Sequence, residues 1–467
     1  MDRFEFLAHR HGFFSLCGLP PIQQAILAAS KVNRRRAASQ AASDAPICAA
    51  LARCTLARPE RGYRNRVEHS ENREGAMQKL LCGLTCVALA FIGAGSASAQ
   101  NSVKIGMINE YSGQFADTGA QIDHGVTLWM KQHGDTVAGK KIELIRKDTG
   151  GMFPDTAKRL AQEAIVRDHA DILGAFSLTP NALAAADVSK QAKKFMVVMN
   201  AATSIITEKS PYIARTSSTT PQLNYTLGQW AAKNGIKTVY TMVSDYGPGI
   251  DAETWFQKGF KDNGGKVLGS VRFPIANPDF SSFVQAAKDK SPDAIYIWIP
   301  GGAQPAAVGK ALAERGIDTK KVKILGQDAL ASETALKSMG DISLGIISVS
   351  DYDYNHQSPM NKEFVKTYNA EFHRNPDFFS IGGYDGAHLI YAALAKTGGK
   401  ADGDSLIAAA KGMSWESPRG PIMIDPETRD IVQTVYIRRV EKVGNELLNV
   451  EIAAVPNVKD PAHGAKK

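Results

Sequence analysis

Cysteine is missing from most of this chain. All five cysteines lie before residue 100, namely Cys17, Cys48, Cys54, Cys82 and Cys86. The 368 residues from Gln100 to Lys467 contain none, which excludes a disulfide framework, a thiolate nucleophile and a cysteine-ligated metal there. The absence also suits an oxidising compartment, where stray thiols would mispair.

The body of the chain also lacks an excess of either charge. Residues 1–76 hold 12 of the 55 Lys and Arg residues but only 7 of the 47 Asp and Glu residues. From Gln100 onward the chain has 42 basic and 40 acidic residues. Because binding to a phosphate backbone needs a concentrated basic face, we expect no nucleic-acid partner.

The apolar stretch Leu80–Ile92 falls short of the roughly 20 residues that span a bilayer. Lys79 precedes it, and the small residues Ala97-Ser98-Ala99 follow it, so residues 77–99 are predicted to be a cleaved secretory signal. An uncleaved anchor or a buried helix is the alternative. We expect export to the periplasm, with the mature chain starting near Gln100.

Residues 1–76 stand ahead of a segment that should be N-terminal. They are rich in Arg, including Arg34-Arg35-Arg36, and show little periodic patterning. Our hypothesis is that translation begins at Met77 and that residues 1–76 are an over-extended start or a disordered extension. A genuine basic extension is the alternative.

Familiar catalytic and metal-binding motifs are missing as well. The chain after residue 100 has no HExxH pair, GxSxG elbow or Walker loop. Gly247-Pro248-Gly249 resembles part of a dinucleotide loop, but Pro248 favours a tight turn into a helix. Asp351–Asn355 begins like a calcium loop, yet His356 stands where glycine is needed. We therefore expect no enzyme, no cofactor and no metal.

What the chain does contain is an alternation of strands and helices. One series runs from a predicted strand at Val103–Ile108 to one at Phe195–Met199, and a second runs from Val239–Val243 to Val322–Leu325. The polar stretch Arg215–Gln222 separates them. This pattern indicates βαβ units, so we predict an α/β fold with two doubly wound parallel-sheet lobes.

The last part of the chain is expected to complete these lobes. Asn361–Phe372 and Tyr384–Thr397 are predicted helices, and Val432–Val443 is predicted to be a terminal strand pair. No separate third domain is apparent.

Ligands of open parallel sheets bind beyond the carboxyl ends of the strands. There, Phe176–Asn181 precedes a predicted helix and Asn200–Thr203 follows a predicted strand. Hydroxyls and free backbone N–H groups at a helix start suit a carboxylate, although each residue taken singly also fits helix capping.

Together these residues resemble the leucine/isoleucine/valine-binding proteins of branched-chain amino acid ABC transporters, which have the type I periplasmic binding fold. The resemblance covers nearly all of residues 101–455. It is carried by Lys104–Ile108, Tyr111-Ser112-Gly113, Asn200–Thr203, Tyr212–Thr216, Asp245-Tyr246-Gly247, Phe280–Phe283, Pro292-Asp293-Ala294 and Gly383-Tyr384-Asp385.

The resemblance implies two lobes joined by a hinge that closes over a ligand. The expected parts are 101–218 plus 351–431 for the first lobe, 219–350 plus 432–455 for the second, and 456–467 for a tail. It further implies an inner-membrane ABC permease as partner and a monomeric protein.

The resemblance also implies site residues. The ligand carboxylate would meet Ser177, Thr179, Ala201 and Thr203, and Tyr246 would close over it from the second lobe. Asp328 falls where the family places an acidic group for an ammonium. Tyr111, Phe115, Trp298 and Tyr384 are candidates for an apolar wall, although Trp298 equally fits the core.

The function that follows is capture of a small carboxylate-bearing ligand for an ABC permease. The ligand expected first is a hydrophobic or branched-chain amino acid. Asp328 is shorter than the glutamate typical of leucine binders, so an aromatic or other apolar acid, or a small amide, is the alternative ligand. A cytoplasmic ligand-sensing regulator on the same fold and a hydrolase are the alternative classes. Export counts against the regulator, and turnover of a bound ligand would indicate the hydrolase.

Overall fold

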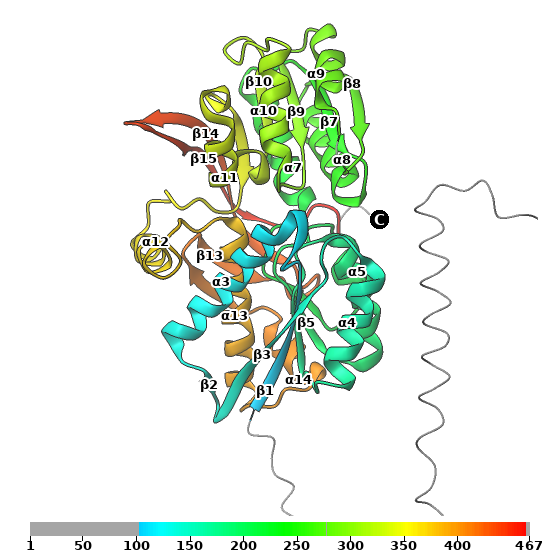
Figure 1. The fold of residues 1–467 in the computed structure, drawn as a ribbon, viewed down its shortest axis with the longest axis vertical. Helices are drawn as coiled ribbons and strands as arrows, with labels where there is room; N and C mark the ends of the chain where they lie inside the picture. Colours follow the sequence, from blue (N-terminus) through cyan, green and yellow to red (C-terminus); the bar gives the residue numbers. More distant parts are fainter. Residues whose placement is uncertain (1–101, 277, 464–467) are drawn as a thin grey trace, which may run out of the picture. The chain divides into compact units, whose positions relative to one another are not determined.

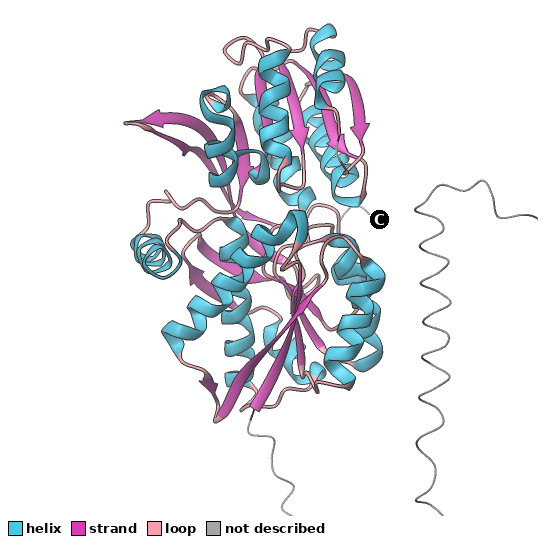
Figure 2. Ribbon diagram, in the orientation of Figure 1, coloured by secondary structure: helices cyan, strands magenta, loops and turns pink. Residues whose placement is uncertain are grey.

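The computed structural model describes residues 102–276 and 278–463, so the predicted signal and residues 1–76 lie outside the described residues. The described residues belong to one compact unit, Gly95–Lys467. This unit contains two largely parallel sheets with helices against both faces of each (Figures 1 and 2). The predicted α/β fold with two doubly wound lobes is confirmed. In these ranges no helix has the length and apolarity that crossing a membrane requires.

The first sheet has six strands in the order β2-β3-β1-β4-β5-β6, all parallel except β2. The strands are β1 (Ser102–Asn109), β2 (Thr136–Val137), β3 (Lys140–Asp148), β4 (Ile172–Ala175), β5 (Phe195–Val198) and β6 (Ile213–Arg215). Apolar residues alternate along β1, so that Ile105 and Met107 enter one core and Ile108 enters the other.

Each face of the first sheet is covered by its own helices. The helices in the core with Ile108 are α4 (Pro154–Val166), α5 (Thr179–Ala192) and α6 (Ile205–Lys209). Those in the core with Ile105 are α3 (Ala116–His133), α12 (Pro359–Phe372), α13 (Phe378–Lys396) and α14 (Gly403–Ala410). A short 3-10 turn, η1 (Gly113–Phe115), precedes α3.

The second sheet has nine strands in the order β12-β13-β14-β11-β10-β9-β7-β8, with β15 paired to β14. Its parallel strands are β7 (Thr238–Ser244), β8 (Lys266–Phe273), β9 (Ala294–Trp298), β10 (Lys323–Gln327) and β11 (Ile347–Ser350). The antiparallel strands are β12 (Ser414–Ser417), β13 (Gly420–Ile424), β14 (Ile431–Val443) and β15 (Glu446–Val458).

Two further cores flank the second sheet. One contains residues of α7 (Thr220–Lys233) and α8 (Gly247–Asp262). The other contains residues of α9 (Phe280–Asp289), α10 (Gln304–Glu314) and α11 (Glu333–Met339). Two 3-10 turns, η2 (Asp328–Ala331) and η3 (Gly340–Ser343), complete this part.

Three segments differ from the predicted elements. The polar stretch after Arg215 already starts α7, because Thr219 and Gln222 form a capping box there. Val432–Val443 is one strand rather than a strand pair, and its partner β15 follows a two-residue turn in which Gly444 has φ 63°.

The third difference is that α13 starts six residues before the predicted Tyr384, because Gly382 and Gly383 do not break it. They allow close packing instead, since a Cβ on Gly383 would lie 2.1 Å from the Ile122 carbonyl oxygen and one on Gly382 would lie 2.1 Å from that of Met199.

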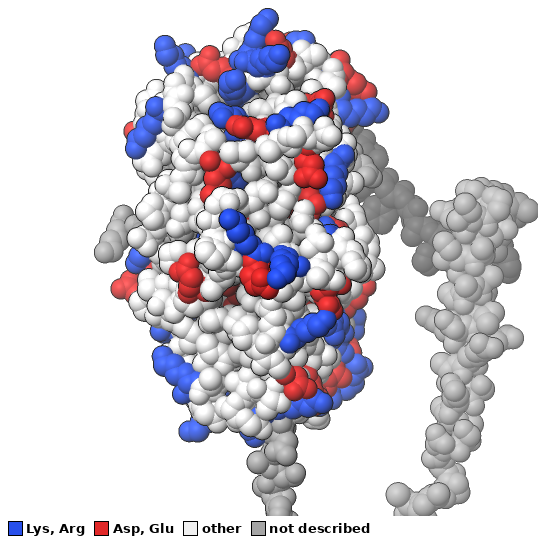
Figure 3. Space-filling view, turned by 90° about the vertical axis from the view of Figure 1, so that its left-hand side faces the viewer, with Lys and Arg blue, Asp and Glu red and all other residues white. Residues whose placement is uncertain are grey.

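Charged side chains of both signs are interspersed on the face shown in Figure 3, and neither sign gathers into a continuous area there. This is the arrangement expected when 42 basic and 40 acidic residues share the chain from Gln100 onward. Such a surface creates no strong field of one sign.

Buried ion pairs lie where the chain crosses between the two sheets. Arg419, only 1% exposed, pairs with Asp351 at 2.5 Å and with Asp385 at 2.7 Å. Arg215 pairs with Asp430 at 2.7 Å, and all of these groups are buried. Because these charges have no access to water, each needs its partner to compensate the free-energy cost of burying it.

We predict that Arg419→Ala lowers the free energy of unfolding by about 3–5 kcal/mol, because it leaves two buried carboxylates without their counter-charge. The matched control is Arg439→Ala, because that side chain is 49% exposed and pairs with Glu441. The control should lose less than about 1 kcal/mol. Urea denaturation measures both, and equal losses would contradict the role given to Arg419.

Candidate ligand-binding site

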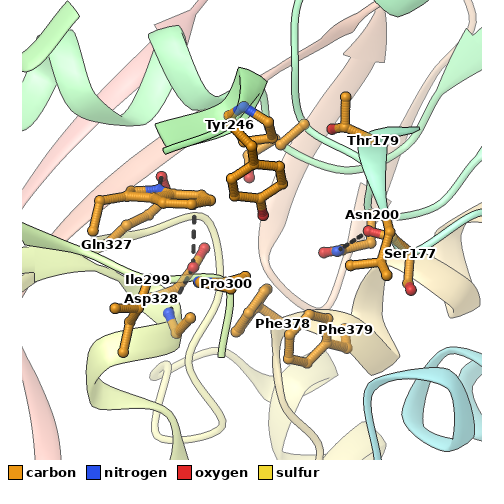
Figure 4. Close-up of a pocket in the computed structure, with 16 residues that line it drawn as sticks. Ser177, Thr179, Asn200, Tyr246, Ile299, Pro300, Gln327, Asp328, Phe378 and Phe379 are labelled. Atoms are coloured by element: carbon orange, nitrogen blue, oxygen red, sulfur yellow. Dashed lines mark hydrogen bonds between the residues drawn. The ribbon is translucent and has the colours of Figure 1, made fainter. Parts of the chain in front are cut away.

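A pocket lies at the carboxyl ends of strands from both sheets (Figure 4). Its walls come from the loops after β4, β5, β7, β9 and β10, from the crossing segment at Ser218, and from the start of α13. Parallel strands place their carboxyl ends at one edge, which is where ligands of open α/β sheets bind.

One end of the pocket is formed by the turn that leads into α5. Ala175 and Phe176 have φ values of 78° and 62°, a strained conformation for residues with a side chain. No side chain caps α5, so the N–H groups of its first turn remain available. The hydroxyl oxygen of Thr179 is buried and has no hydrogen-bond partner among the described residues. This end therefore offers donors to an anion.

Ser177 connects this end to a buried acid, Glu110. The Ser177 hydroxyl donates to Glu110 Oε2, and Glu110 Oε1 accepts from Asn181 Nδ2 at 2.6 Å and from Thr149 Oγ1 at 3.1 Å. Burial raises the pKa of Glu110 to about 7, although these hydrogen bonds oppose the shift. Asn200 Nδ2 donates to the Ser177 carbonyl at 2.8 Å and holds the backbone of this turn.

Aromatic rings form the middle of the pocket. Tyr246 lies between the two ends, with Phe378 and Phe379 across the gap from it (Figure 4). The rings of Tyr246 and Trp298 are 5.7 Å apart, and those of Phe378 and Phe379 are 3.8 Å apart. Burial raises the pKa of the Tyr246 hydroxyl well above its usual range, so this group stays neutral. A flat, apolar ligand part matches such walls.

Asp328 forms the other end. It is 2% exposed, and its Oδ1 accepts from the Ala329 N–H at 2.7 Å and from Gln327 Nε2 at 3.3 Å. Its Oδ2 has no partner among the described residues. Burial raises the pKa of Asp328 well above its usual range, and the charge of Asp351 adds to the shift. Burial therefore favours the neutral form of this carboxyl group.

Four of the eight predicted site residues line this pocket: Ser177, Thr179, Tyr246 and Asp328. Trp298 lines it too and also packs in the core beside the second sheet. Phe115 instead lines a separate hollow beside Phe280.

The structure does not place the other four predicted residues in the lining. The Tyr111 hydroxyl donates to Asp123 of α3 at 3.2 Å. The Tyr384 hydroxyl donates to Gln132 at 2.7 Å, because Tyr384 lies on the side of α13 that packs against α3.

Ala201 and Thr203 lie in the loop after β5, next to the lining residues Asn200 and Ala202. Their carbonyl oxygens both accept from Nη1 of the buried Arg215, each at 2.9 Å. These contacts direct the two carbonyl groups toward the ion-paired crossing segment.

Sequence reasoning missed Phe378, Phe379 and Ser218 as lining residues. The signal for the two phenylalanines was Asp377, an N-cap residue type that forms a capping box directly before them. For Ser218 the only signal was the density of hydroxyls in Arg215–Gln222.

One cluster of possible metal ligands occurs among the described residues, at Asp430, Asp460 and His463. Arg215 already pairs with Asp430 at 2.7 Å, and His463 Nε2 lies 2.7 Å from the same carboxylate. Arg215 compensates the charge of Asp430, and His463 bonds to the same carboxylate, so we interpret the cluster as a structural contact of the C-terminal segment.

Comparison with known proteins identifies one family and several similar proteins. The family described as periplasmic binding protein matches residues 102–445. A curated relative from Brucella melitensis, named Leu/Ile/Val-binding protein homolog 6, is 38% identical over 382 residues, which are 81% of this chain and 97% of the relative.

Two solved structures from Rhodopseudomonas palustris are similar as well, and both are solute-binding proteins of ABC transporters. One, in complex with 3,4-dihydroxybenzoic acid, is 53% identical with a TM-score of 0.75 and covers 78% of this chain and 99% of its own. The other, in complex with p-hydroxybenzoic acid, is 41% identical with a TM-score of 0.76 and covers 78% of this chain and 100% of its own.

The raised pKa of Glu110 predicts a pH-dependent stability. The ordinary pKa near 4.5 applies in the unfolded chain, so the folded protein binds the proton more tightly. The resulting stabilisation is complete below about pH 4.5 and is lost as the pH rises through about 7. Glu110→Gln removes this contribution. Relative to the variant, the free energy of unfolding of the wild type should fall by on the order of 2–3 kcal/mol between pH 5 and pH 8.

Urea denaturation of both proteins at the two pH values measures this difference. Glu363→Gln on the surface of α12 is the matched control, because its side chain is 62% exposed. A wild-type-to-variant difference for Glu110 that stays constant with pH would show that the buried carboxyl is ionised throughout.

Proposed function

This chain belongs to the periplasmic binding protein family, and on that basis we propose that it captures an aromatic carboxylic acid of the benzoate type for an ABC permease. The observation that carries the proposal is the pocket itself, which has hydrogen-bond donors at one end, aromatic walls, and at the other end a buried carboxyl group whose pKa is raised by burial. The hydroxybenzoic acids bound in the two similar structures support the same ligand class.

The branched-chain amino acid predicted first has less support. An α-ammonium group needs an ionised or strongly polar acceptor when it leaves water. Asp328, which was expected to supply that charge, is buried, and burial disfavours its ionised form more than the charge of Arg438 favours it. The name of the curated relative still favours an amino acid, so the two ligand classes must be compared directly.

In the proposed complex the ligand carboxylate lies at the start of α5. The N–H groups of the first turn and the hydroxyl of Thr179 donate to it, and the partial positive charge of the helix start adds to the attraction. The ring lies between Tyr246 and the pair Phe378 and Phe379. No buried cation is needed, because charge-assisted hydrogen bonds in a water-poor pocket are strong.

Membership in this family implies a periplasmic location, while the signal at residues 77–99 remains a prediction. The remaining parts of the proposal are a permease partner, a monomeric protein, closure of the lobes over the ligand, and release of the ligand unchanged. Chromatography of the ligand recovered after prolonged incubation would reveal any turnover and thus a hydrolase.

Isothermal titration of the purified protein tests the ligand class. We expect benzoate-type acids to bind, and leucine, valine and urea to bind at least tenfold more weakly or not at all. Thr179→Val keeps the shape of the side chain but removes a donor to a charged group, so it should weaken benzoate binding about tenfold or more.

Thr367→Val is the matched control, because Thr367 lies on α12, outside the pocket lining. It should leave binding unchanged. Tight binding of leucine together with no binding of any aromatic acid would restore the amino-acid interpretation.

A further inference from the structure

The two ends of the pocket offer different hydrogen-bonding groups to a ligand. The α5 end supplies backbone N–H and hydroxyl donors, which suit a carboxylate, whereas the opposite end is lined by Asp328, whose Oδ2 has no partner among the described residues. In Figure 4 Asp328 and Gln327 lie on one side of the gap and Ser177 and Thr179 on the other. A benzoate bound by its carboxylate therefore points its far ring edge toward Asp328.

The unpaired Oδ2 of Asp328 has no substitute partner nearby. Gln327, the closest amide, already accepts at Oε1 from Trp298 Nε1 at 2.8 Å and from Asn224 Nδ2 at 2.7 Å. Asn224 in turn accepts from the Tyr296 hydroxyl at 2.5 Å. This network holds Gln327 in place with its Nε2 directed at Oδ1 of Asp328, and Oδ2 stays without a partner among the described residues.

A buried polar atom without a partner is costly, so native structures rarely retain one without a reason. The charges around Asp328 indicate what kind of partner fits. Asp351 and Asp377 disfavour its ionised form, and Arg438, which favours it, is already bonded to Asp353 at 2.9 Å. A neutral carboxyl group can both donate and accept a hydrogen bond, as a phenolic hydroxyl can.

We propose that Asp328 is a specificity-determining residue that binds a hydroxyl group on the ring, at the position opposite the carboxylate. The preferred ligands are then 4-hydroxylated benzoates rather than benzoate itself. This inference rests on the proposed function, because it takes the carboxylate to lie at α5. It predicts that the site discriminates between 4-hydroxylated benzoates and benzoate, because a polar group that hydrogen-bonds a ligand hydroxyl is left unpaired when that hydroxyl is absent.

The test is isothermal titration of the purified protein with benzoate, 4-hydroxybenzoate and 2-hydroxybenzoate. We expect the wild type to bind 4-hydroxybenzoate about tenfold more tightly than either of the other two acids, as one additional hydrogen bond allows. The 2-hydroxy isomer carries its hydroxyl beside the carboxylate and cannot reach Asp328. This comparison needs no variant.

Three variants then assign the preference to Asp328. Asp328→Leu removes the hydrogen bond and should bring the ratio of the 4-hydroxybenzoate and benzoate dissociation constants to within about twofold of one. Asp328→Asn keeps a neutral donor and acceptor of the same size and should retain most of the preference. Thr179→Ala, at the opposite end, should weaken both acids and leave their ratio unchanged.

Two outcomes would overturn the inference. One is a wild-type ratio of the benzoate and 4-hydroxybenzoate dissociation constants near one. The other is a ratio that Asp328→Leu does not alter, whether or not that variant weakens the binding of both acids. Preference for 4-(aminomethyl)benzoate, which carries an ammonium group, would show that Asp328 is ionised. Binding of aromatic acids without the preference overturns this inference alone, whereas no aromatic acid binding at all also overturns the proposed function.

Discussion

Most walls of the pocket depend on the shared direction of parallel strands. In each sheet the strands end at one edge, and the loops after β4, β5, β7, β9 and β10 bring their side chains to the pocket from those edges. Residues as distant in sequence as Ser177 and Asp328 therefore line one cavity. The loops carry the polar chemistry, while the strands beneath them are almost wholly apolar and keep the loops in place.

The crossing segments add a second constraint. Arg215, Arg419 and Arg438 are buried beside acidic partners that lie in or next to the segments joining the two sheets. Buried ion pairs contribute little net stability but strongly disfavour arrangements in which one partner loses the other. Here they specify how the chain crosses, and Arg215 also holds the carbonyl groups of the loop after β5.

The electrostatics of the pocket follow from burial rather than from net charge. Burial raises the pKa of Glu110 behind Ser177 and of Asp328 at the far end. Two acids that would repel an anionic ligand when ionised are thereby shifted toward their neutral forms. A carboxylate can then bind to backbone and hydroxyl donors without a buried Lys or Arg, and the aromatic walls select what is attached to it.

The sequence alone determined the fold class, because strand and helix periodicities are local and strong over most of the chain. It also indicated the helix-start motif around Ser177 and Thr179, and the position of Tyr246 after a strand. It could not show that Tyr384 faces α3 while Phe378 and Phe379 face the pocket, since that depends on how α13 packs through its paired glycines. Nor could it reveal the raised pKa of Asp328, because the pKa of a carboxyl group depends on the burial and neighbouring charges that only the folded chain creates.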